Sequence, residues 1–305
     1  MKSLPLENPD YQALQHSFGR WLKVLGYSQQ ACYMLPLHVR EFLNYLEEHQ
    51  ITGLQHLTGQ EPESYIKYMA TERCNAMTGQ PLSTNHLNKH RQALNLLSRY
   101  LKETGSGVIN WQLAQLPPDE RVPAVLTESQ VGKLYTACEA TTIGLRDRAL
   151  LSILYGCGLR RSEAVALRTK DINLGSNQLY VRKAKGNTQR YVPMSQGVTQ
   201  DLKQYLELSR PLLLRKTSEA LFITYAGQAM GGQGMLARLR VWLSAADIPK
   251  TGIGLHTLRH SIATHLLQAG MKLENISRFL GHKSIESTQI YTHLIGQQAH
   301  LADGV

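Results

Sequence analysis

Side chains suited to phosphate chemistry recur in five short segments of the second half of the chain. In chain order these are Gly158-Leu-Arg160-Arg-Ser-Glu163, Lys185-Gly-Asn, His256-Thr-Leu-Arg259-His260, Leu280-Gly-His282 and Tyr291. Guanidinium groups pair with phosphate oxygens, histidine and lysine transfer protons, and a tyrosine hydroxyl can attack phosphorus. Taken singly, each segment also has an ordinary explanation, such as surface charge at a helix start, an exposed hairpin lysine or a half-buried tyrosine.

As an ordered series, these segments resemble the active-site pattern of the tyrosine recombinases, the phage-integrase family, and within it the Xer-type bacterial and archaeal members. Three further stretches are similar to that family: Leu145-Arg-Asp147-Arg-Ala-Leu-Leu151, Ala263-Thr-His265-Leu-Leu267 and Ser287-Thr-Gln-Ile-Tyr291-Thr-His293. The resemblance covers nearly the whole chain. It implies a site-specific recombinase that cleaves and rejoins DNA through a 3′-phosphotyrosine intermediate and a Holliday junction, for dimer resolution or for integration and excision of a mobile element.

The resemblance assigns catalytic roles to six residues: Arg160, Lys185, His256, Arg259, His282 and Tyr291. On this interpretation Arg160 and Arg259 stabilise a doubly charged, phosphorane-like transition state. Tyr291 attacks phosphorus; a phenol with a pKa near 10 is about 0.1% ionised at pH 7, a deficit of about 4 kcal/mol that the arginines and His256 offset. Lys185 protonates the leaving 5′-oxygen, and His282 donates a hydrogen bond to a non-bridging oxygen.

Three more residues are expected to support the site: Asp147, Glu163 and His260. The resemblance implies that they orient the catalytic groups, and a purely structural role accounts for them equally well. Two arginines that converge without acidic partners repel each other. We therefore expect an anion, the scissile phosphate, to lie between Arg160 and Arg259.

Three other functions fit parts of the pattern. A metal-dependent nuclease would use the histidines, but Arg259 lies within their densest group and the only acid near it is Glu274. A type IB topoisomerase shares the nucleophile chemistry, and a non-catalytic DNA-binding protein could keep the same fold. The complete set of six residues and the Gly-Leu-Arg160 context favour a recombinase, which needs no metal and no cofactor. The histidines that a metal-dependent nuclease would use are His256, His260, His265, His282 and His293.

The charge of the chain is distributed unevenly. It has 33 Lys and Arg against 23 Asp and Glu, a net charge of +10. Residues 1–123 hold 11 of each sign, so the whole surplus lies in residues 124–305, which hold 22 basic and 12 acidic residues. A segregated basic surplus favours a polyanionic partner, nucleic acid before an anionic membrane surface.

Apolar periodicity predicts a mainly α fold with one small β-sheet. Four helices are expected in residues 1–103, at 11–25, 39–46, 62–69 and 84–101. The family resemblance implies that they form a SAM-like core-binding domain. The last of these carries Lys89, Arg91 and Arg99, which are candidate contacts to DNA phosphates, although an ordinary solvated face explains them as well. Residues 104–123 are expected to form a linker around a short anchoring segment.

The family resemblance implies that residues 124–305 form the α+β catalytic domain and its C-terminal tail. Helices are predicted from Thr127 to 140, at 145–155, from Arg160, and near 197–208, 234–246, 257–269, 272–280 and 285–292. Strands at 178–183 and 189–193 flank a hairpin turn that contains Lys185. Fourteen residues follow Tyr291, and their polarity leaves open whether the tail is exchanged between protomers.

Composition and partners complete the prediction. No apolar run is long enough for a membrane span, the N-terminus has no signal-peptide pattern, and four scattered cysteines are expected to be buried thiols, so we expect a cytoplasmic protein. The family resemblance implies double-stranded DNA with an inverted-repeat core site as the substrate. It also implies a homotetramer on DNA, with room for a paralogous recombinase or an accessory directionality factor.

Overall fold

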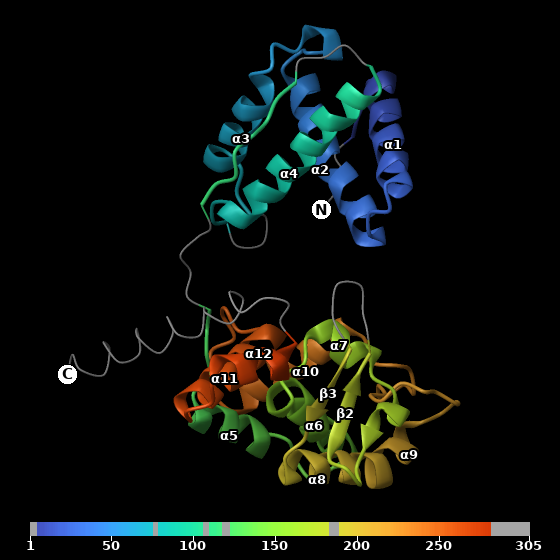
Figure 1. Ribbon diagram of the computed structural model, residues 1–305, viewed down its shortest axis with the longest axis vertical. Coiled ribbons are helices and arrows are strands. Elements are labelled where there is room, and N and C mark those ends of the chain that lie inside the picture. Colours follow the sequence, from blue (N-terminus) through green and yellow to red (C-terminus); the bar gives the residue numbers. More distant parts are fainter. Residues whose placement is uncertain (1–4, 76–78, 106–109, 118–122, 183–188, 282–305) are drawn as a thin grey trace, which may run out of the picture. The chain divides into compact units, whose positions relative to one another are not determined.

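The computed structural model describes residues 5–75, 79–105, 110–117, 123–182 and 189–281 (Figure 1). These residues are mainly helical and include one three-stranded sheet, which confirms the predicted fold class. The chain divides into two compact units, residues 1–121 and 122–305, each with its own hydrophobic core. No helix in the described ranges is both long enough and apolar enough to cross a membrane.

In the described part of the N-terminal unit lie four α-helices: α1 (Pro9–Val24), α2 (Gln29–Glu48), α3 (Glu61–Thr71) and α4 (Thr84–Glu103). Asn8, Ser28 and Ser83 begin three of them by accepting backbone N–H bonds in the first turn. Such caps satisfy donors that a helix start leaves without an intrahelical partner. The predicted apolar faces point inward, and the fully buried side chains include Phe18, Leu22, Phe42, Leu43, Leu46, Leu94 and Leu97.

Residues 110–117, which were expected in the linker, lie along α4. Asn88 exchanges two hydrogen bonds of 2.9 Å with the backbone of Leu116. Asn95 makes the same kind of pair with Leu113, at 2.9 and 2.8 Å. Trp111 is buried in the N-terminal core. This part of the predicted linker is therefore held on the N-terminal unit by side chains of α4.

Three histidines meet inside the N-terminal unit. His38 of α2 and His90 of α4 are buried with their ring centroids 4.3 Å apart, and Nε2 of His90 lies 3.2 Å from Nε2 of His86. Nδ1 of His90 lies 3.0 Å from the Tyr65 hydroxyl. Burial, reinforced by the charges of neighbouring histidines and cations, lowers the pKa of His38 to about 4 and that of His90 to about 2. Both rings are therefore neutral at pH 7.

We expect the N-terminal unit to lose stability in mild acid. An unfolded histidine takes up a proton near pH 6.5, whereas His38 and His90 resist protonation down to about pH 4 and about pH 2. Their contribution is complete above pH 6.5 and falls by about 1.4 kcal/mol per pH unit for each ring as the pH drops further. Thermal unfolding of the full chain, followed from neutral pH to about pH 5, measures this slope.

His38→Phe is the matched variant for this measurement. Nδ1 of His38 has no hydrogen-bond partner within the described structure, so a phenyl ring removes the titrating group at little other cost. The variant should show a flatter loss of stability with falling pH than the wild-type chain. A slope equal to that of the wild-type chain would contradict the role of this histidine.

The C-terminal unit packs helices against a small antiparallel sheet. Its strands β1 (Ile172–Asn173), β2 (Gln178–Val181) and β3 (Arg190–Pro193) follow the order β1-β2-β3, with Leu179 opposite Val192. The predicted hairpin, formed by β2 and β3, thus belongs to a three-stranded sheet. The sequence did not predict β1, because a two-residue strand is too short to show alternation. The helices are α5 (Glu128–Thr136), α6 (Thr142–Leu151), α7 (Arg161–Ala166), α8 (Gln196–Gln204), α9 (Arg210–Leu213), α10 (Gly232–Ala245), α11 (Leu255–Gln268) and α12 (Leu273–Leu280).

The turn between α6 and α7 leads directly to Arg160, the first residue of the candidate site. A π-helical turn, Ser152–Gly156, follows α6 and leads to Gly158, whose φ is +59°. Glycine adopts this left-handed conformation readily, and a Cβ here would lie 2.7 Å from Cδ2 of Leu280. A larger residue at this position would therefore strain the backbone and force the Leu280 side chain of α12 to shift.

The four cysteines are free thiols. Cys138 and Cys157 are buried, as expected, and Cys32 is partly exposed. Cys74 is exposed, which corrects the expectation for that residue, because it lies beyond α3 in an isolated bridge with Pro81 at the surface.

Candidate active site

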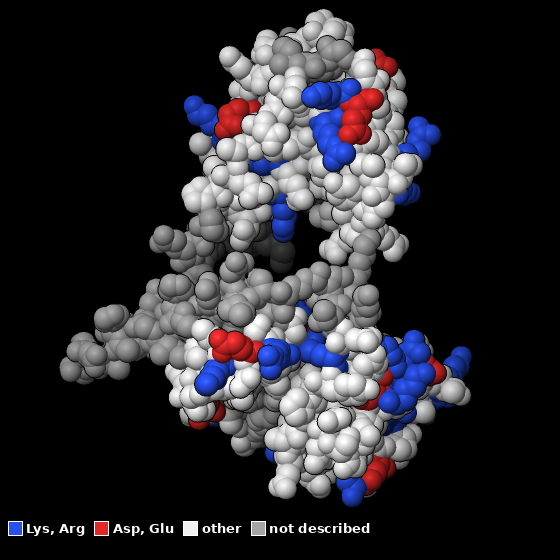
Figure 2. Space-filling view, in the orientation of Figure 1, with Lys and Arg blue, Asp and Glu red and all other residues white. Residues whose placement is uncertain are grey.

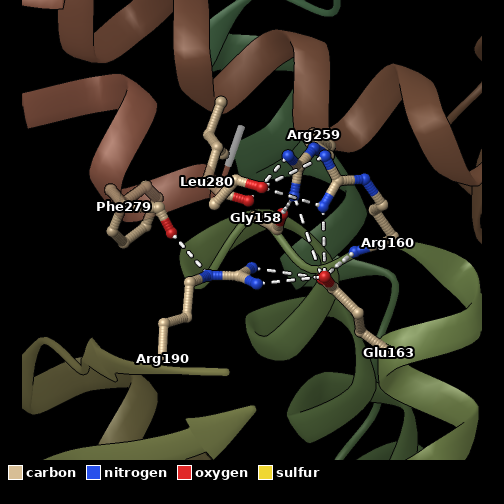
Figure 3. A network of polar contacts seen from close by, with 8 residues as sticks. Gly158, Arg160, Glu163, Arg190, Arg259, Phe279 and Leu280 are labelled. Carbon is tan, nitrogen blue, oxygen red and sulfur yellow. Dashed lines mark hydrogen bonds and ion pairs between the residues drawn. The ribbon is translucent and has the colours of Figure 1, made fainter. Parts of the chain in front are cut away.

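Three arginines converge on the buried carboxylate of Glu163 (Figure 3). Its Oε2 accepts a 2.9 Å bond from the backbone N–H of Arg160, and its Oε1 accepts a 3.1 Å bond from Nη1 of the same residue. Arg190 donates to both oxygens, at 3.0 and 3.1 Å. Nη1 of Arg259 lies 3.9 Å from Oε2. The structure therefore brings together the predicted residues Arg160, Glu163 and Arg259, and it adds Arg190.

Each of these residues is placed by a different element. Arg160 is the residue before α7, and Glu163 stands in the first turn of that helix, so its carboxylate reaches back to the Arg160 N–H in the manner of a capping box. Arg259 lies in the second turn of α11, after a start at Gly254 where the Thr257 hydroxyl accepts the Gly254 N–H. Arg190 is the first residue of β3.

The carboxyl end of α12 holds the same three arginines by successive carbonyl groups. Phe279 O accepts from Nε of Arg190 at 3.1 Å, and Leu280 O accepts from Nη2 of Arg259 at 2.8 Å. The carbonyl oxygen of Gly281, the left-handed residue that ends the helix, accepts from Nη1 and Nη2 of Arg160 at 3.4 and 3.5 Å. Nη1 of Arg259 also donates to Gly158 O at 2.6 Å. Cations at a helix carboxyl end are favoured by the helix dipole.

The charge of this group corrects one expectation from the sequence. Arg160 and Arg259 do have an acidic partner, because Glu163 lies between them and is ionised. Burial alone would raise the pKa of Glu163, but the hydrogen bonds and charges of Arg190 and Arg160 outweigh it and lower the pKa below its usual value. Three guanidinium groups share one carboxylate, so the group keeps a positive surplus. The Arg160 side chain is 25% exposed, against 8% for Arg190 and 4% for Arg259, and it is the most accessible of the three to a ligand.

Two of the three histidines of α11, His256 and His260, adjoin this cationic group. The His256 side chain is exposed overall, yet partial desolvation of its ring, followed by the charges of Arg259 and Arg161, lowers its pKa. Burial lowers the pKa of His260 to about 4, with further contributions from His256 and Arg259. Both rings are therefore neutral at pH 7 and able to accept a proton.

Asp147 belongs to a different network from the Glu163 carboxylate. Its Oδ1 accepts bonds of 3.0 and 2.7 Å from Arg146, and its Oδ2 accepts from Nε of Arg238 at 2.7 Å and from the Trp242 indole at 3.0 Å. These contacts tie α6 to α10. These contacts fit the purely structural role that the sequence had also allowed for Asp147.

The described side chains can be compared with the metal site that a metal-dependent nuclease would need. Within the described ranges, no group of three or more His, Cys, Asp or Glu side chains is arranged to hold a metal ion. His265, one of the histidines that a nuclease would use, instead pairs through Nδ1 with the Tyr155 hydroxyl at 2.8 Å.

The predicted DNA contacts of α4 differ in their surroundings. Lys89 is exposed, and Arg99 is exposed beside Glu103, with which it forms a 2.8 Å ion pair. Arg91 is only 6% exposed; its guanidinium donates to Glu63 at 2.7 Å and to Ala114 O at 2.6 Å. The prediction of a DNA contact at Arg91 is therefore corrected, because this residue holds the 110–117 segment on the N-terminal unit.

Basic side chains also gather on the C-terminal unit. Figure 2 shows a row of Lys and Arg across the visible face of this unit, interrupted by a few acidic side chains. The predicted residues Lys185, His282 and Tyr291 lie outside the described residues, as does the predicted helix at 285–292.

Solved structures share this fold. The crystal structure of the XerH site-specific recombinase bound to palindromic difH substrate, a post-cleavage complex, matches with a TM-score of 0.74, over 97% of this chain and 84% of that chain. The two sequences are 21% identical. At this identity the likeness establishes the fold alone.

Sequence comparisons identify the family. Residues 124–297 match the model described as Phage integrase family. Tyrosine recombinase XerD of Proteus mirabilis is 41% identical over 177 residues, which span 57% of this chain and little more than half, 56%, of that protein. Tyrosine recombinase XerC 2 of Ralstonia nicotianae is 31% identical over 279 residues, which span 90% of this chain and 79% of that protein. The chain belongs to the phage integrase family of tyrosine recombinases.

Proposed function

We propose that this protein is a site-specific DNA recombinase that cuts and rejoins duplex DNA through a covalent phosphotyrosine. The observation that carries the proposal is the convergence of Arg160, Arg190 and Arg259 on a single buried carboxylate, in a chain of the phage integrase family. A site with surplus positive charge suits a scissile phosphate, whose negative charge grows in the transition state of phosphoryl transfer.

In the proposed reaction the Tyr291 hydroxyl attacks the scissile phosphorus. The new phosphorus–oxygen ester forms as the bond from phosphorus to the 5′-oxygen breaks, and Lys185 gives that oxygen a proton. His256, whose lowered pKa keeps it neutral, accepts the proton that the phenol loses. His282 donates a hydrogen bond to a non-bridging oxygen. Because the ester preserves the energy of the broken bond, the reverse attack by a 5′-hydroxyl reseals the strand without a cofactor.

The two units have separate tasks in this proposal. Residues 1–103 form the core-binding domain, residues 104–123 the connection and residues 124–305 the catalytic domain. Lys89 and Arg99 of α4 supply exposed cations for backbone phosphates, which position a protein on DNA without reading its sequence. A homotetramer on two inverted-repeat sites, acting in the cytoplasm, completes the exchange through a Holliday junction.

The test is a trapped covalent complex. We expect the protein to form a covalent adduct with a nicked suicide duplex built from the inverted repeats that flank its gene. The adduct should form in EDTA, because the proposed chemistry uses no metal. Loss of the adduct in EDTA would instead support the metal-dependent nuclease. Relaxation of supercoiled plasmid without strand exchange would support a type IB topoisomerase.

A further inference from the structure

Arg190 is the residue that connects the sheet to the other two arginines. Its side chain is 8% exposed, and all three guanidinium nitrogens are engaged: Nη1 and Nη2 with the two oxygens of Glu163, and Nε with Phe279 O (Figure 3). It therefore bonds to the first turn of α7 and to the carboxyl end of α12 at the same time.

Gly281 shows how closely the end of α12 rests on this guanidinium. A Cβ built at Gly281 would lie 2.7 Å from Nη1 and 2.9 Å from Cζ of Arg190. The backbone that presents Leu280 O to Arg259 and Gly281 O to Arg160 is thus in contact with Arg190. Arg190 therefore supports the backbone segment that carries the acceptors of both other arginines.

The Glu163 carboxylate gives the second connection. The Arg190 guanidinium donates one hydrogen bond to each oxygen, whereas the Arg160 guanidinium donates only to Oε1, its other bond coming from the backbone N–H, and Nη1 of Arg259 stays 3.9 Å from Oε2. Without Arg190, each oxygen of the buried carboxylate would lose one donor, and the charge would draw the guanidinium groups of Arg160 and Arg259 towards itself, since a buried charge with too few partners is costly. Their positive charge would then be directed to Glu163 instead of to DNA.

We propose that Arg190 is a positioning residue for DNA cleavage, which fixes the spacing and direction of Arg160 and Arg259 through Glu163 and the carboxyl end of α12. The inference rests on the proposed recombinase function and deepens it. A lysine cannot serve in its place. Its donors all lie on one nitrogen, so it has neither the planar fork that pairs with a carboxylate nor a separate donor at the position of Nε.

The test compares adduct formation by wild-type protein and Arg190→Gln on two suicide duplexes that differ only at the scissile phosphate. On the phosphodiester, the variant should cleave about 100-fold more slowly, the size of effect that small misplacements of catalytic groups produce. On a methylphosphonate, which lacks one of the charges that the arginines neutralise, its rate should come within about threefold of the wild-type rate. Arg190→Lys should behave like Arg190→Gln on both duplexes.

Arg210→Gln is the matched control for folding. The Arg210 guanidinium also holds three main-chain carbonyls of the C-terminal unit, those of Ser218, Ala220 and Leu221, and these lie outside the Glu163 group. It should lower the melting temperature without the substrate-dependent change in cleavage. All variants should be assayed below their melting temperatures, with DNA binding measured alongside.

Four results separate the possible outcomes. An equal defect of Arg190→Gln on both duplexes would overturn the inference and leave Arg190 a role in folding only. Full activity of Arg190→Lys would also overturn it, since charge alone would then suffice. Rescue by a 5′-thiolate leaving group, which needs no proton, would place the effect on Lys185 and likewise overturn it. A wild-type protein that forms no adduct on the phosphodiester contradicts the proposed function itself, which distinguishes that failure from failure of this inference.

Discussion

Replacement of Tyr291 by phenylalanine is expected to abolish the covalent protein–DNA adduct. The substitution removes the single oxygen that bonds to phosphorus and leaves the aromatic ring, so we expect adduct formation to fall at least about 10³-fold, as when an enzyme loses its nucleophile. DNA affinity should change little, because most of it comes from contacts to the backbone phosphates. Denaturing gels of the suicide-substrate reaction measure the adduct, and mobility shifts measure binding.

Tyr225→Phe provides the matched control. Tyr225 is an exposed tyrosine of the same unit, and its ring lies beside the Arg215 guanidinium. Loss of its hydroxyl should leave the adduct at the wild-type level. An adduct that persists in Tyr291→Phe at more than a trace would mean that another side chain is the nucleophile.

Arg259→Gln is expected to combine a large loss of cleavage with a loss of stability. The guanidinium is almost fully buried and donates to Gly158 O at 2.6 Å and to Leu280 O at 2.8 Å, so its removal leaves two buried carbonyls without these donors. We expect a cost to folding of about 1–3 kcal/mol for each such acceptor. The transition state also loses a donor, for which a fall in the cleavage rate of about 10²–10³-fold is usual.

The two effects can be measured separately. Thermal unfolding reports the loss of stability, and single-turnover cleavage at a temperature where the variant is folded reports the loss of catalysis. Arg210→Gln, which also removes donors to main-chain carbonyls, should change the first measurement and not the second. If the cleavage defect of Arg259→Gln disappears once the variant is fully folded, Arg259 is a structural residue only.

Much of the fold could be predicted from local patterns. The helices of the N-terminal unit begin at side chains that cap them, such as Ser83, and their apolar residues recur at helical spacing, as in Phe18 and Leu22. The missed features are those without a local signal. β1 has two residues, and the attachment of residues 110–117 depends on Asn88 and Asn95, whose partners lie 18–28 residues away in the chain.

Only part of the candidate site could be predicted from the sequence, because only part of it depends on residues that are close together in the chain. Arg160 and Glu163 are three residues apart at a helix start, so their pairing follows from local geometry. Arg190 was missed, although it lies on the same side of β3 as the buried Val192, and a charged side chain on the buried side of a strand predicts a partner. Arg91 was misassigned because helical periodicity alone cannot show that another segment covers its position.

The sequence by itself determined the residue types and their order, and with them the family and the phosphate chemistry that its members imply. Only the tertiary structure decided which groups share the Glu163 carboxylate, and that the carboxyl end of α12 holds Arg160, Arg190 and Arg259 by three consecutive carbonyls. The physical reason is range. A motif specifies side chains within a turn or a strand, whereas hydrogen bonds between residues 21 to 121 positions apart exist only once the core has packed those elements together.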